Sequence, residues 1–254
     1  MELTMTFALI ILGVVMGVLS GVLGVGGGIF IVPALIALGY SPVHAISTSG
    51  VPILLSAISA VTTHIRMKTF LLAPALRIGI PALLVAQGGV WLAHLVRPTL
   101  LLVLFGSFLL ANFWLVRLKK VSKETLMVSV GPKRIVLEVM IGGTGGFLGG
   151  FFGLGGGVVM VPLQLVLLNE NIKNAARVSI AVVLITALSS VTGHALKGTV
   201  LWNVGIAMGV GSILGAQVGT LVAPKMSDTF VKRFFQLLLF FLAVFVFYRA
   251  WKSM

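Results

Sequence analysis

The chain has 254 residues, of which 59% are hydrophobic and only 9% are charged, whereas a soluble domain carries about 25% charged residues. This composition excludes a soluble protein and predicts a chain embedded in the lipid bilayer. The 18 lysines and arginines against five acidic residues give a net charge of +13, and in a membrane protein such charges occupy short loops beside anionic headgroups. We therefore expect no nucleic-acid partner. The absence of cysteine excludes a disulfide, a thiol nucleophile and a thiolate metal site.

The apolar runs, taken in chain order, predict an all-α polytopic membrane protein. The first, Met5 to Leu38, would be about 50 Å long as one helix at ~1.5 Å per residue, too long for one crossing. We expect it to break at Gly24-Val-Gly-Gly-Gly28, because adjacent glycines weaken a helix. Later runs, such as Leu100 to Leu115 and Leu237 to Tyr248, reach with their flanks the roughly 20 residues of a spanning helix and lack the alternation of barrel strands.

An internal repeat organises the chain. Residues Gly17–Pro33 match Gly146–Pro162 at a shift of 129, with nine identities in seventeen positions. A shift of 130 then aligns Ala45–Gly89 with Ala175–Gly219, including the pairs Ser49/Ser179, His64/His194, Thr69/Thr199 and Gln87/Gln217. Paired polar residues in the same order point to a duplication, because chance similarity between membrane segments involves mainly apolar residues.

We expect a first repeat over residues 1–118, a basic linker over 119–134 and a second repeat over 135–254. Each repeat is predicted to hold a glycine-broken helix pair and three further transmembrane helices. The positive-inside rule places the linker in the cytoplasm. If each glycine segment doubles back, five basic residues of the second repeat fall inside and three outside; a single crossing reverses the two sets. Doubling back is favoured, and it makes the halves inverted repeats. The inside set is Lys173, Arg177, Lys225, Lys232 and Arg233, and the outside set is Lys197, Arg249 and Lys252.

The motif Gly-x-x-Ser-Gly-x-x-Gly-x-Gly-Gly-Gly, with a proline five residues later and a downstream Ser/Thr cluster, resembles the TauE/SafE family of sulfite exporters and related permeases. The first copy is Gly17–Pro33 and the second is Gly146–Pro162. The resemblance implies a multi-pass protein of the prokaryotic inner (cell) membrane that transports sulfite, sulfonates or other small anions, and no enzyme. The second copy departs from the pattern, with Gly149 in place of Ser20 and Arg177 aligned to Ser47.

The two glycine breaks are the first candidates for substrate binding. A broken helix exposes free N–H groups and the positive end of a helix dipole at membrane depth, which suits an anion. Close helix packing through small residues is the alternative explanation. A dinucleotide fingerprint is excluded, because it requires a preceding strand. The candidates are Gly26, Gly27, Gly28, Gly155, Gly156 and Gly157.

Polar side chains near these breaks supply further candidates. Ser47, Thr48, Ser49 and Ser179 can donate hydroxyls to an oxyanion, although such residues in membrane helices often bond to backbone. Arg177 fits an oxyanion but can also snorkel to the interface, and Arg77 is similarly ambiguous. Gln87 and Gln217 either bridge helices or line the path. His64 and His194 are candidates for gating or proton coupling, with a solvated or capping role as the alternative.

Carboxylates are not expected deep within a span, since Glu138 lies only a few residues into one and an interfacial position is predicted for it. No catalytic residue, metal site or cofactor is predicted, because paired carboxylates and a histidine-rich cluster are both missing. We predict an anion carrier with a midplane site between the glycine breaks and alternating access. An anion channel and an intramembrane enzyme using the histidines stay open as alternatives, as does a homo-oligomer packed through glycine-rich faces.

Overall fold

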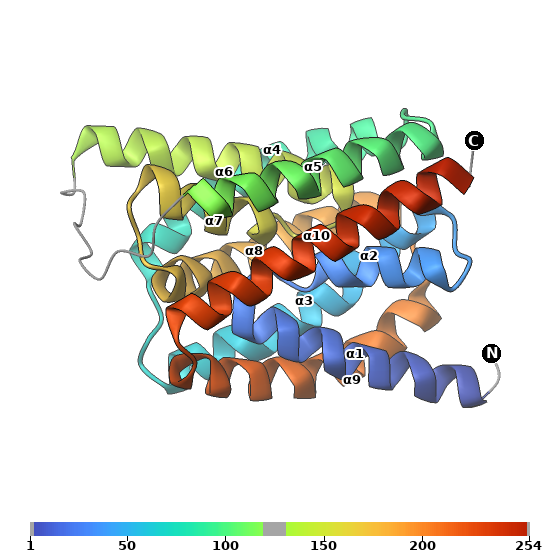
Figure 1. Ribbon diagram of the computed structural model, residues 1–254, viewed down its shortest axis with the longest axis horizontal. Helices are drawn as coiled ribbons and strands as arrows, with labels where there is room; N and C mark the ends of the chain where they lie inside the picture. Colours follow the sequence, from blue (N-terminus) through green and yellow to red (C-terminus); the bar gives the residue numbers. More distant parts are fainter. Residues whose placement is uncertain (1–2, 119–130, 253–254) are drawn as a thin grey trace.

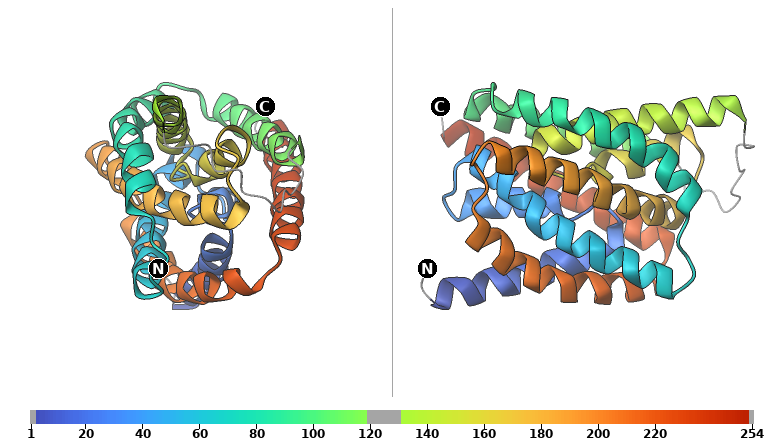
Figure 2. Two further views of the ribbon diagram at one scale, coloured as in Figure 1. Left: turned by 90° about the vertical axis from the view of Figure 1, so that its left-hand side faces the viewer. Right: turned by 180° about the vertical axis from the view of Figure 1, so that it is seen from behind.

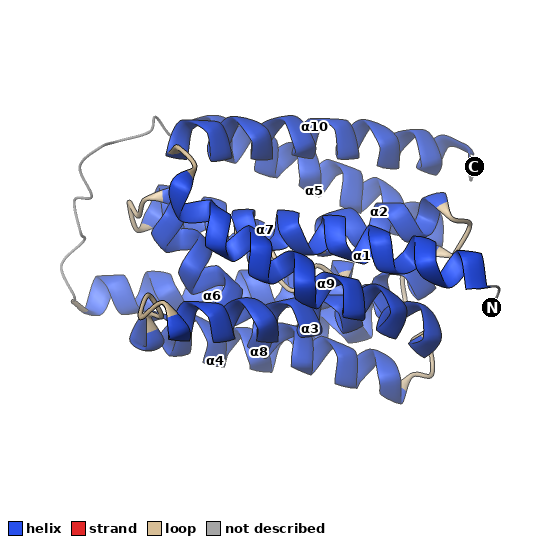
Figure 3. Ribbon diagram, turned by 90° about the horizontal axis from the view of Figure 1, so that it is seen from below, coloured by secondary structure: helices blue, strands red, loops and turns tan. Residues whose placement is uncertain are grey.

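The computed structural model describes residues 3–118 and 131–252, and this part of the chain is helical, with short loops (Figures 1 and 3). Eight of its helices are long and apolar enough to span a membrane, which confirms the predicted all-α polytopic class. Residues 119–130 of the expected linker lie outside the described residues. The helices are α1 Leu3–Leu23, α2 Gly28–Ala37, α3 Pro42–Arg66, α4 Leu72–Ala93, α5 Pro98–Leu118, α6 Pro132–Phe152, α7 Gly157–Leu167, α8 Ile172–Leu196, α9 Trp202–Val222, the short 3₁₀ turn η1 Ala223–Lys225, and α10 Asp228–Lys252.

Each glycine segment folds into a hairpin of one long and one short helix. Helix α1 starts at the end of the bundle that lies on the right in Figure 1, and α2 returns toward the same end. Helices α6 and α7 repeat this arrangement from the opposite end, where the chain leaves α5. The segments therefore double back, as the charge distribution favours, and the two hairpins enter the bundle in opposite directions.

Glycine stripes join each hairpin to a helix from the other half of the chain. Helix α1 packs on α9, where a Cβ atom on Gly13 or Gly17 would meet the backbone of Met208 or Ser212. Helix α6 packs on α4 in the same way, through Gly142, Gly146 and Gly150. Small residues let helix backbones approach closely in a membrane, where lipid removes the hydrophobic drive for association. These glycine-rich faces thus hold the two halves together.

The two helices that follow the hairpins, α3 and α8, form the centre of the bundle. They are the most buried of the spanning helices, and the short helices α2 and α7 lie buried beside them. Helices α5 and α10 pack against each other on one flank of the bundle (Figure 2). The breaks and the hydroxyl-bearing stretches of α3 and α8 are thereby placed in the interior, away from lipid.

Candidate functional site

Both glycine segments leave the helical conformation, as predicted. Gly26 and Gly27 have φ angles of 80° and 76°, and their counterparts Gly155 and Gly156 have 69° and 81°. These left-handed values favour glycine, because a Cβ atom makes them costly for other residues. Gly27 and Gly156 stand at the N-caps of α2 and α7. Each break therefore ends one helix and starts another that points its positive dipole end into the interior.

The two breaks cross each other in direct backbone contact. A Cβ atom added to Gly28 would lie 2.7 Å from the Leu154 Cα atom, and one added to Gly157 would lie 2.8 Å from the Val25 Cα atom. Ile53 of α3 and Val183 of α8 pack against both breaks. The crossing brings Gly26–Gly28 and Gly155–Gly157 together, as the sequence suggests, and the close packing that was the alternative explanation for the glycines is present too.

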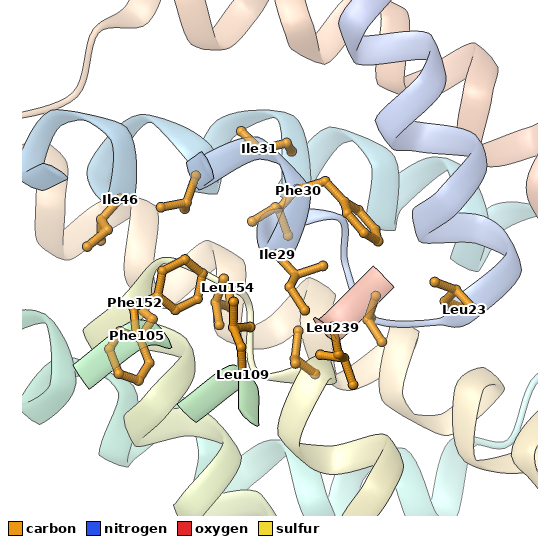
Figure 4. Close-up of a cluster of buried hydrophobic side chains, with 14 of the residues drawn as sticks. Leu23, Ile29, Phe30, Ile31, Ile46, Phe105, Leu109, Phe152, Leu154 and Leu239 are labelled. Atoms are coloured by element: carbon orange, nitrogen blue, oxygen red, sulfur yellow. The ribbon is translucent and has the colours of Figure 1, made fainter. Parts of the chain in front are cut away.

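Apolar side chains surround this crossing. One buried cluster contains Leu23 and Ile29–Ile31 from the first hairpin, Phe152 and Leu154 from the second, and Phe105 and Leu109 of α5 (Figure 4). All of these side chains are buried. Water is excluded from such an environment, so any polar group that faces it acts in a low dielectric.

Hydroxyl groups on α3 and α8 fix the second break. Ser49 donates to the Gly153 carbonyl at 2.7 Å, and Thr186, which the sequence did not single out, donates to the Gly155 carbonyl at 2.5 Å. Ser179 accepts from the Gln164 amide at 2.7 Å. Thr48 accepts from the Leu201 backbone N–H at 3.0 Å, at the start of α9. The predicted Ser/Thr cluster is therefore buried and bonded within the protein.

A charged recess of about 440 Å³ opens at the end of the bundle where α5 ends and α6 begins. A volume of this size is in the range of small-molecule sites. Gln164 lies in the wall of the recess, and its side-chain amide donates to the Ser179 hydroxyl behind it. Four basic and two acidic side chains line it, an excess of two positive charges: Lys68, Arg77, Arg134 and Arg177 against Glu138 and Glu170.

Two of the four cations are held by the two carboxylates. Glu138 is completely buried: Arg77 donates to both of its carboxylate oxygens, and the Arg134 Nε atom donates to Oε1 at 3.0 Å. The Arg134 Nη2 atom also contacts Glu170 at 2.7 Å. The interfacial Glu138 expected from the sequence is thus a buried, doubly paired carboxylate, and Arg134, assigned to the linker, lies in the first turns of α6.

Arg177 and Lys68 make no ion pair with a carboxylate in the described part of the chain. Among the described residues, the Arg177 Nη1 atom donates only one long hydrogen bond, 3.4 Å, to the Asn174 side chain. Arg177 also borders a small pocket with His64, whose Nδ1 atom lies 3.0 Å from the Thr69 hydroxyl. The recess therefore offers two cations, with the Arg177 guanidinium able to bind an oxyanion through two N–H groups.

An apolar cluster separates the recess from the second glycine break. Ile78, Leu168 and Val178 line the recess and pack with Met160 and Ile141. A Cβ atom on Gly156 would lie 2.9 Å from the Met160 methyl carbon, so this side chain touches the break. These side chains therefore lie between the recess and the second break.

The opposite end of the bundle carries three histidines in a hydrogen-bonded cluster. His194 is 1% exposed, and its Nδ1 atom lies 3.0 Å from the Ser47 hydroxyl. Thr199 donates to Ser47 at 2.8 Å and lies 3.3 Å from the His94 Nε2 atom, while the His44 Nδ1 atom lies 2.8 Å from the Thr199 carbonyl. No group of three ligand side chains in the described ranges could hold a metal ion.

The repeated glutamines differ in their surroundings. Gln87 is exposed on α4 and donates to the Ser189 carbonyl at 2.7 Å and to its hydroxyl at 2.8 Å, so it bridges α4 and α8. Gln217 is exposed on α9 and makes no comparable bond to described residues. Neither amide lies at the crossing or in the recess, so the helix-bridging alternative describes Gln87.

Comparison with known proteins agrees with this architecture. The family model described as "Sulfite exporter TauE/SafE" matches residues 9–246. The chain belongs to the TauE/SafE family. It is 27% identical to "Probable membrane transporter protein YunE" of Bacillus subtilis, with 86% of this chain and 88% of the relative covered. A "Probable membrane transporter protein" of Xylella fastidiosa is 27% identical over 95% of both chains. No solved structure matches the chain significantly. This TauE/SafE protein is thus a multi-pass integral membrane protein of a transporter family.

Several residues of the recess and of the histidine cluster were not among the site residues predicted from the sequence. Arg134 and Glu138 are spaced i, i+4 at the start of an apolar span, a pattern that signals a pair on one helix face. Thr199 and His94 carry no such local signal, because their partners come from distant segments, and Gln164 meets Ser179 of the following helix.

Proposed function

We propose that this TauE/SafE member is a carrier for a small oxyanion, such as sulfite or a sulfonate, and that the charged recess is the entrance to its path. The observation that carries the proposal is the pair of cations, Arg177 and Lys68, that border the recess and have no carboxylate partner among the described residues. A small anion entering there replaces hydration by charge-assisted hydrogen bonds. The family's description as sulfite exporters supports a sulfur oxyanion as the substrate class.

The other half of the chain has no equivalent recess chemistry. At the aligned positions, Ala207 stands for Arg77, Leu9 for Glu138 and Leu35 for Gln164. If Arg77, Glu138 and Gln164 had only a structural role common to both halves, we would expect polar residues at the counterparts too, whereas all three counterparts are apolar. We infer that the charged recess serves one face of the membrane, and the more basic end of the bundle, where it opens, is the cytoplasmic face by the positive-inside rule.

Alternating access explains why the path is closed between the recess and the crossing. The Met160 cluster seals the break from the recess side in this conformation. In the proposed cycle the antiparallel halves rock about the crossing of the breaks, so that this seal opens while the opposite end closes. The free N–H groups at the starts of α2 and α7 then face the anion at the midplane.

Replacing Arg177 with glutamine should raise the KM for the transported anion about 10- to 100-fold. A hydrogen bond to a charged group contributes about 1.5–3 kcal/mol, and ~1.4 kcal/mol corresponds to a tenfold change in affinity. The measurement is the concentration dependence of sulfite or thiosulfate uptake into proteoliposomes. Arg66→Gln is the matched control, because Arg66 is exposed at the same end and does not line the recess. If Arg177→Gln had the same KM as the native protein, the recess would not be part of the transport path.

A further inference from the structure

The histidine cluster at the end opposite the recess forms a continuous chain of hydrogen-bonding groups toward the second glycine break. It runs from His94, which is partly exposed, through Thr199 and Ser47 to His194 and ends at the Gly150 carbonyl. The successive contacts are 3.3, 2.8, 3.0 and 3.4 Å. Gly150 lies one turn of α6 before Gly153, where the break begins.

Backbone carbonyls define which ring nitrogen of each histidine carries its resting proton. The His94 Nδ1 atom lies 2.9 Å from the Val90 carbonyl, and the His194 Nε2 atom faces the Gly150 carbonyl. A carbonyl oxygen only accepts, so each of these nitrogens carries a hydrogen. The remaining nitrogen of each neutral ring, His94 Nε2 and His194 Nδ1, is then free to take a proton, and both face the hydroxyl pair of Thr199 and Ser47.

We propose that this chain is a proton path and that His194 is a proton-binding site that couples anion transport to protons. A proton on His94 Nε2 passes to the Thr199 hydroxyl, the Thr199 proton passes to Ser47, and the Ser47 proton passes to His194 Nδ1. Both hydroxyls end with one hydrogen, so only the two histidines change protonation. This inference deepens the proposed function, on which it rests, by naming the coupling ion.

The position of His194 explains why a proton there affects an anion. A charged His194 places a positive charge beside the last turn of α6, next to the second break and in surroundings where screening by water is weak. Anion and proton then stabilise each other and move together. The ionisable groups placed against His194 are His94, with ring centroids 5.1 Å apart, and His44, which reaches it through Thr199.

The corresponding position at the recess end lacks such a chain. His64 contacts Thr69, but Arg177, Asn174 and Pro224 stand where Ser47, His44 and His94 stand at the other end. A proline cannot bind a proton, and an arginine stays charged. The two ends of the bundle therefore differ in function: protons bind at the histidine end, and the anion binds at the recess end.

Thr199→Val tests this path, because valine keeps the shape of threonine and removes the hydroxyl that joins His94 to Ser47. The protein is reconstituted into liposomes that contain a pH-sensitive dye. Two quantities are measured with thiosulfate or sulfoacetate, which stay ionised near neutral pH: exchange at equal pH, and accumulation with acidic medium outside. Thr192→Val is the matched control, since Thr192 lies on α8, the helix that precedes Thr199, and among the described residues its hydroxyl bonds only to the Leu188 carbonyl of its own helix.

The native protein and Thr192→Val should accumulate the anion and acidify the lumen as it enters. Thr199→Val should lose at least about tenfold of both signals, the size expected when a positioned proton donor is removed, while exchange at equal pH persists. His194→Gln, checked for folding by its thermal unfolding, should behave in the same way. Full accumulation in Thr199→Val, loss of exchange together with accumulation, or native exchange without proton movement would each overturn the proton path. Only the absence of anion exchange in the native protein would overturn the carrier function as well.

Discussion

A single methyl group at the crossing of the two glycine breaks is expected to abolish transport. Gly28→Ala would place its Cβ atom 2.6 Å from the Ile53 side chain and 2.7 Å from the Leu154 Cα atom. Gly157→Ala would place its Cβ atom 2.9 Å from the Gly24 carbonyl oxygen. Backbone cannot yield as a side-chain tip does, so the two breaks must move apart. Such overpacking costs about 1–3 kcal/mol of folding free energy, and it displaces the helix ends that are proposed to face the anion.

The measurement is initial anion uptake by each variant, normalised to folded protein in the membrane. Gly143→Ala is the matched control, because Gly143 lies within α6 and no atom stands within 4 Å of an added Cβ. We expect native uptake in this control and background uptake in the other two. Native rates in Gly28→Ala and Gly157→Ala would show that the crossing is only a packing contact far from the path.

Removing the buried carboxylate of the recess is expected to destabilise the protein while increasing its attraction for anions. Glu138→Gln leaves Arg77 and Arg134 without their shared partner. Breaking a buried ion pair by removing one member costs about 3–5 kcal/mol. The same change adds one unit of positive charge to the recess, so the KM for the anion should fall.

Thermal unfolding in detergent and the concentration dependence of uptake measure these two effects separately. Asp228→Asn provides the comparison, because Asp228 and its partner Lys173 are each about one third exposed and lie 3.4 Å apart. An exposed pair of this kind contributes about 0–1 kcal/mol. An unfolding temperature of Glu138→Gln equal to that of Asp228→Asn would contradict the structural role of Glu138.

The sequence contains enough information to predict the helices and the breaks. Long apolar runs specify spanning helices wherever they occur, and the glycine triplets interrupt them through local conformational preference alone. The direction of each hairpin follows from basic residues such as Lys173 and Lys197, which fall at opposite ends of the bundle. These features depend on properties that each segment carries by itself.

The site depends on contacts between segments, and it could be predicted only in part. Arg177 was a candidate because a guanidinium group fits an oxyanion, and the structure places it in the wall of the recess. Glu138 was misjudged, since its burial depends on Arg77, 61 residues away. Ser47 was expected to contact the substrate, but its hydroxyl is taken by His194 and Thr199. Such pairings arise from how the inverted hairpins pack, which local patterns do not reveal.

The most direct test of the carrier proposal is flux into proteoliposomes of the purified native protein. Uptake of sulfite, thiosulfate, sulfoacetate and taurine is compared with uptake of acetate, lactate and chloride, each over a range of concentrations. We predict saturable uptake that is selective for the sulfur oxyanions. Preference for the carboxylates would contradict the substrate class, and the absence of flux for every anion would contradict the carrier function.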